Sequence, residues 1–64
     1  MNPVLPSVLV GLEKQIAYNL LQEAGVIFRI IVEDGQYNVM TRDVIPTRMN
    51  LILDKGIVMN AAYG

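Results

Sequence analysis

The residues best suited to chemistry lie in residues 41–50, TRDVIPTRMN, which mix two arginines, an aspartate and an asparagine. An arginine presents several hydrogen-bond donors in a fixed fork, which suits carbonyl oxygens and carboxylates. Arg48 and Asn50 flank Met49, so on a strand both would point away from an apolar core. Asp43 is a suitable acceptor for Arg48. The pattern predicts a polar network that holds an irregular segment in shape.

The composition argues against an enzyme and against a bound cofactor or metal ion. The chain contains no histidine and no cysteine, which excludes a thiolate nucleophile, a Ser-His triad and a zinc-finger ligand set. The spacing of Glu33, Asp34, Asp43 and Asp54 matches no metal-binding loop. A domain of this size hardly encloses a catalytic pocket. We therefore expect no enzyme, no cofactor and no metal.

Length and charge limit the partners. With 64 residues and a net charge of −1, the chain is expected to form a single domain, 1–64. Its five basic residues are scattered and its aromatic residues are few, so we expect no nucleic-acid partner. No apolar run is long enough to span a bilayer, and no signal peptide is recognised, which favours a cytoplasmic protein without a membrane partner.

Periodicity predicts one helix over residues 12–24. Its apolar residues recur on one helical face, and they are Leu12, Ile16, Ala17, Leu20, Leu21 and Ala24. Gly11 is a possible N-cap, and Gly25 is a natural helix stop. Before this helix, Pro3 and Pro6 favour an extended arm over residues 1–8.

Three strands are predicted after the helix. Residues 26–32 are rich in β-branched side chains, residues 48–54 alternate, and residues 57–62 return after a tight turn at 54–56. A turn begins at Glu33 and opens a long loop, 33–47. The expected fold is α+β, with one helix packed on a small mixed β-sheet and a long extended loop between the first two strands.

Several motifs, taken together, resemble the potato inhibitor I family of serine protease inhibitors, most closely its bacterial branch. Leu9-Val10-Gly11 is similar to the family's entry to the helix, and Ala17 stands where the family has a helix alanine. Ile30-Ile31-Val32 resembles the first strand. The loop pattern Thr-x-acidic-x-x-x-x-Arg-x-(Arg/Asn) fits residues 41–50, and Asp54 and Gly64 complete the series. The likeness covers residues 9–64.

The resemblance implies a potato inhibitor I-like fold and a reactive-site loop that a serine protease, trypsin- or subtilisin-like, binds as it binds substrate. Arg42 would enter the specificity pocket, with Thr41 and Asp43 flanking it and Val44 following. An arginine there implies trypsin-like targets, whose pocket floor is acidic. The segment before Thr41 is longer than in the plant-type pattern, so the specificity position stays open between Arg42, Thr41 and Met40.

In the same family pattern, Arg48, Asn50 and Gly64 would support the loop from below. Plainer interpretations stay open for the same residues: a solvated Arg42, a turn residue at Asp43 and a strand-edge Asn50.

A second function is compatible with the same fold: a non-inhibitory interaction module or a homo-oligomer, such as a small bacterial or phage protein. Hydrophobic residues make up 53% of the chain, so part of the apolar surface is available for a partner. The apolar start of the chain adds to this argument. The sequence leaves both a monomer and a homodimer open.

Overall fold

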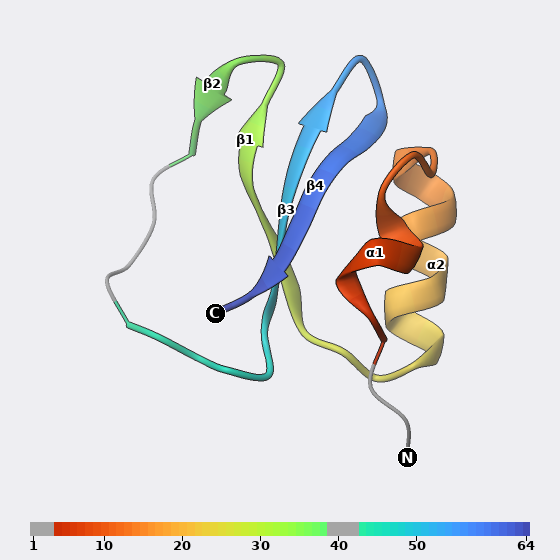
Figure 1. The fold of residues 1–64 in the computed structure, drawn as a ribbon, viewed down its shortest axis with the longest axis vertical. Coiled ribbons are helices and arrows are strands. Elements are labelled where there is room, and N and C mark those ends of the chain that lie inside the picture. The colour runs from red at the N-terminus through yellow and green to blue at the C-terminus, as the bar shows by residue number, and fades with distance from the viewer. Residues whose placement is uncertain (1–3, 39–42) are drawn as a thin grey trace.

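The computed structural model describes residues 4–38 and 43–64 (Figure 1). The elements in chain order are α1 (Pro6–Leu9), α2 (Lys14–Glu23), β1 (Phe28–Glu33), β2 (Gln36–Tyr37), β3 (Met49–Asp54) and β4 (Ile57–Tyr63). The strands form one sheet in the order β2-β1-β3-β4. β1 and β3 are parallel, whereas the two outer pairs are antiparallel. The predicted small α+β domain with a mixed sheet is confirmed.

The core lies between α2 and β3. Leu21 and Ala17 of α2 are fully buried, and β3 alternates buried and half-buried residues along its length, as predicted. The buried apolar cluster consists of Leu9, Ala17, Leu21, Met49, Leu51, Leu53 and Val58. Ile16, predicted on the buried face of the helix, is instead half exposed, because the stripe that meets the sheet is narrower than the sequence pattern.

Gly25 ends α2 as predicted, with φ +70°. The Gly25 N–H donates to the Gln22 carbonyl at 3.1 Å, and the Val26 N–H donates to the Leu21 carbonyl at 2.9 Å. These two bonds form a Schellman motif, in which a left-handed residue lets the chain satisfy the last helical carbonyls. β1 can therefore start only a few residues after the helix.

The prediction that Gly11 caps the helix is wrong. α2 begins at Lys14, and the cap position is occupied by Glu13, whose side chain makes no capping hydrogen bond. The backbone before the helix is engaged elsewhere. The Gly11 N–H donates to the Val58 carbonyl at 2.8 Å, and the Val58 N–H donates to the Leu12 carbonyl at 2.9 Å. These residues extend the edge of β4, which delays the start of the helix.

The extended arm predicted for residues 1–8 is also corrected. Pro6–Leu9 forms the short helix α1, and proline favours the first helical position because its fixed φ suits a helix and its missing N–H is not needed there. Leu9 is buried in the core. The Tyr63 hydroxyl donates to the Val4 carbonyl and so joins this segment to the end of β4.

The loop predicted over residues 33–47 is shorter than expected. Glu33 is the last residue of β1, and Gln36–Tyr37 returns beside it as β2. The intervening Asp34 and Gly35 both have positive φ, 53° and 80°, as a two-residue type I′ hairpin requires. Of the remaining connection, residues 38–48, the described residues 43–48 lead back to the start of β3 on the side away from both helices (Figure 1).

Candidate functional site

A tight turn returns the connecting segment to the sheet. The Arg48 N–H donates to the Ile45 carbonyl at 2.9 Å, which closes a four-residue turn with Pro46 at its second position. Proline suits that position because its φ is already fixed near the required value. The turn brings the start of β3 back beneath Asp43, so that Arg48 and Asp43 meet across a short stretch of chain.

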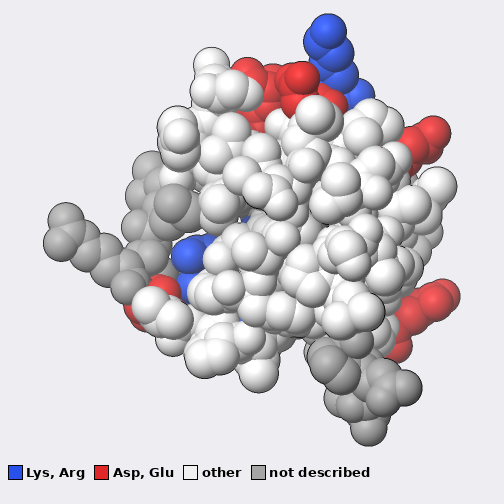
Figure 2. Space-filling view, viewed as in Figure 1, with Lys and Arg blue, Asp and Glu red and all other residues white. Residues whose placement is uncertain are grey.

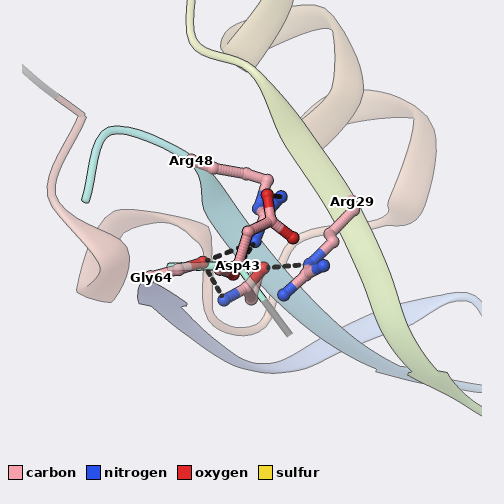
Figure 3. A network of polar contacts seen from close by, with 5 residues as sticks. Arg29, Asp43, Arg48 and Gly64 are labelled. Carbon is pink, nitrogen blue, oxygen red and sulfur yellow. Dashed lines mark hydrogen bonds and ion pairs between the residues drawn. The ribbon is translucent and has the colours of Figure 1, made fainter. Parts of the chain in front are cut away.

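Arg48 is nearly buried, with 7% of its surface exposed. Its Nη2 donates to the Asp43 carbonyl at 3.1 Å, and its Nη1 lies 3.4 Å from Asp43 Oδ2 (Figure 3). The first distance is that of an ordinary hydrogen bond, whereas the second is long. Within the described residues, the buried Nε of Arg48 has no hydrogen-bond partner. Arg48 thus holds the backbone of Asp43 more firmly than its carboxylate.

Gly64 connects Arg48 with the neighbouring polar residue. The Gly64 N–H donates to the Arg48 carbonyl at 2.9 Å. The Gly64 carbonyl accepts from Asn50 Nδ2 at 2.7 Å and, at a longer 3.4 Å, from Arg48 Nη2. The three residues predicted to support the loop, Arg48, Asn50 and Gly64, therefore form one contiguous group with Asp43.

Arg29 joins this group, although the sequence analysis did not single it out. Its Nε donates to Asn50 Oδ1 at 2.8 Å (Figure 3), and in the parallel pairing of β1 with β3 it stands beside Asn50. A charged residue within the apolar strand FRIIVE was the available signal. Its partner depends on the strand register, which the sequence did not specify.

Asn38 holds the other end of the segment and was also missed. Its N–H donates to the Ile31 carbonyl at 3.0 Å, and its Nδ2 donates to the Ile30 carbonyl at 2.8 Å. An exposed asparagine after a strand is common, so nothing in the sequence distinguished it. The segment is therefore attached to β1 at Asn38 and to the Arg48 group at Asp43.

Of the other predicted loop residues, Val44 is the one that the structure describes. Val44 points to solvent, with 77% of its surface exposed. Thr41, Arg42 and Met40 lie outside the described residues. Within residues 4–38 and 43–64, no three histidine, cysteine or acidic side chains come close enough together to hold a metal ion. The arrangement can hold a backbone segment in place and display what lies beside it.

No family model matches the chain, and no similar protein was found among curated proteins or solved structures. In the described part of the chain, neither helix has the length and hydrophobicity needed to cross a membrane.

Proposed function

We propose that this protein is a serine protease inhibitor with a potato inhibitor I-like arrangement, which offers the segment around Arg42 to the protease as a substrate is offered. The observation that carries the proposal is the buried guanidinium of Arg48 beneath Asp43, 3.1 Å from its carbonyl oxygen. A nearly buried arginine that binds main chain next to an exposed Val44 is suited to fixing the shape of a displayed segment.

The tethers on both sides support tight binding. A segment that is held at both ends has less conformational entropy to lose on association than one that is free, so more of its contact energy appears as affinity. Attachment at Asn38 and at Asp43 also opposes separation of the two ends after cleavage of the peptide bond between them. A cut bond then stays aligned and can be resealed, which slows net hydrolysis.

Trypsin-like proteases are the proposed targets, with Arg42 as the specificity residue and Arg42–Asp43 as the scissile bond. This assignment comes from the resemblance to the family, and Thr41 and Met40 remain the alternatives one and two positions earlier.

An inhibition assay against trypsin, chymotrypsin and subtilisin tests the proposal. We expect inhibition of trypsin, and we expect Arg42→Ala to weaken it by at least ~10-fold, since the cationic contact in the pocket is lost. Lys55→Ala, which removes a cation from the tip of the β3–β4 hairpin, is the matched control and should leave inhibition unchanged. The proposal is wrong if all three enzymes simply digest the intact protein.

A second candidate, a homodimer without inhibitory activity, is favoured by one surface. Figure 2 shows a broad face over α1 and β4 on which charged side chains lie only at the rim. Residues 4–12 and 56–64, which include these elements, contain no charged residue. Val8 of α1 and Met59 of β4 are each about half exposed.

Sedimentation velocity separates the two candidates. Met59→Lys places a charge on an exposed position of β4, so a dimer formed through this strand should dissociate. Ile27→Lys changes an exposed apolar residue outside α1 and β4 and should not affect such a dimer. A stable dimer that shields residues 43–47 would argue against inhibition. A monomer at all accessible concentrations would remove the second candidate.

A further inference from the structure

We propose that Arg29 is a positioning residue for the segment between β2 and β3, and that it acts on this segment through Asn50. Its effect on inhibition rests on the proposed function, whereas its effect on the order of the segment does not. Arg29 lies on β1, which precedes the segment, and Asn50 lies on β3, which follows it. The contact between them therefore links β1, to which Asn38 is hydrogen-bonded, with β3, which the segment enters.

The chemistry of arginine fixes the orientation of the Asn50 amide. The two ends of an asparagine amide have similar shapes but opposite hydrogen-bonding roles. The guanidinium of Arg29 can only donate, so the Asn50 atom 2.8 Å from its Nε must be the oxygen. This orientation turns Nδ2 towards the Gly64 carbonyl, 2.7 Å away. The Gly64 carbonyl can only accept and favours the same orientation, so without Arg29 one of the two contacts that fix the amide is lost.

The orientation of Asn50 in turn affects Arg48. Asn50 Nδ2 and Arg48 Nη2 share the Gly64 carbonyl, and the asparagine makes the much shorter bond, 2.7 Å against 3.4 Å. Because Asn50 satisfies this carbonyl, Arg48 Nη2 is available to the Asp43 carbonyl at 3.1 Å. A reversed amide would present an oxygen to the Gly64 oxygen. Arg48 Nη2 would then be the remaining side-chain donor of this group for the Gly64 carbonyl, and it would move away from the Asp43 carbonyl.

The relay therefore runs from Arg29 through Asn50 and Gly64 to Arg48, and ends on the backbone of Asp43 (Figure 3). Among the described contacts of Arg29, Asn50, Gly64 and Arg48, those to Asp43 are made by Arg48. Arg29 supplies a charge-assisted hydrogen bond from behind, and such bonds are about twice as strong as neutral ones.

The first experiment measures order without any protease. In Arg29→Met, which keeps an apolar stem but removes the donor, we expect the Asn50 side-chain amide resonances to move and the backbone order parameter of Val44 to fall. Lys14→Met is the matched control, since it removes a cation that contacts Glu33 and not this network. The inference is wrong if Arg29→Met changes these signals no more than Lys14→Met does.

The second experiment is a double-mutant cycle on trypsin inhibition. Arg29→Met should weaken inhibition by about 3- to 10-fold, the range expected from one net hydrogen bond, and should have no further effect in an Asn50→Ala background. Arg29→Lys, which keeps a donor, should recover part of the loss. Additive effects of the two substitutions would overturn the relay.

The two proposals fail separately. If the wild-type protein inhibits no protease, the proposed function fails, and the resonances of Asn50 and Val44 still decide the role of Arg29. If Arg29→Met does not fold, the same measurements on Arg29→Lys decide it, because loss of the fork geometry should still shift the Asn50 amide resonances.

Discussion

Arg48 brings a positive charge to a nearly buried position, where the charge is stable only if hydrogen bonds replace the lost water. Its acceptors are the carbonyl and carboxylate of Asp43 and the carbonyl of Gly64. The Asp43 side chain is about half exposed, so solvent screens the ion pair, and an exposed pair of this kind contributes only about 0–1 kcal/mol. The bond to the Asp43 main chain is therefore the contact that matters most.

Replacement of Arg48 tests this argument. Arg48→Ala removes the charged donor that two main-chain carbonyls share, so we expect the free energy of unfolding to fall by roughly 1–3 kcal/mol. Arg48→Lys keeps the charge but loses the forked guanidinium, so its free energy of unfolding should lie between those of the wild type and Arg48→Ala. Urea denaturation measures both, and Lys55→Ala is the exposed control. An Arg48→Ala protein as stable as wild type would show that the buried bonds contribute nothing.

For individual residues, the alternation of polar and apolar side chains predicted more of the structure than composition did. Met49 and Asn50 were assigned to opposite faces of one strand, and the structure places them so. Arg29 and Asn38 were not predicted, because each makes its contacts with residues that only the strand pairing brings near. A period of two residues tells which face a side chain occupies, but not which strand lies beside it.

At the scale of elements, the end of α2 depends on a left-handed residue. Gly25 has φ +70°, and a Cβ added there would meet no atom within 4 Å. A substitution therefore costs conformational energy alone, without a steric clash.

We expect Gly25→Ala to lower the free energy of unfolding by about 1 kcal/mol, since a Cβ disfavours positive φ. Gly25→Asn should lose less, because asparagine tolerates this conformation. Thermal and urea unfolding of the pair gives the comparison. Equal losses for both variants would mean that the cost is not one of backbone conformation.

The elements that the sequence did not predict are the short ones, α1 and β2. Each is too short to show a period, and each is stabilised by tertiary contacts: α1 by the burial of Leu9, and β2 by pairing with β1. Pro6 was interpreted as a sign of extended chain, although it also fits the first turn of a helix. Local patterns found the long elements and misjudged those that depend on the rest of the fold.

At the scale of the whole molecule, one ion pair joins the helical layer to the sheet. Lys14 Nζ lies 2.9 Å from Glu33 Oε2 and 5.7 Å from the centre of the Tyr18 ring. The hydrogen bond to Glu33, with a further contribution from Tyr18, raises the pKa of Lys14 above its ordinary 10.5. Folding therefore favours the protonated lysine.

This shift predicts how stability depends on pH. A group whose pKa is raised by folding stabilises the protein fully below its unfolded pKa, and the contribution disappears as pH rises through the folded value. At neutral pH, the urea midpoint of the wild-type protein should be higher than that of Lys14→Met. The difference between the two midpoints should vanish well above pH 10.5. Lys55→Met controls for the loss of a lysine. If the difference in urea midpoint persists at high pH, its cause is packing of the lysine stem and not the charge.

The two attachment points, Asn38 and Asp43, have a consequence for engineering. Asn38 is bonded to the carbonyls of β1, and the Asp43 carbonyl accepts from Arg48, which immediately precedes β3. The four positions 39–42 lie between these two attachments, so we expect replacement of their sequence to leave both attachments in place. Foreign peptides inserted there should leave the domain folded, which would make this chain a compact carrier for displaying short recognition sequences.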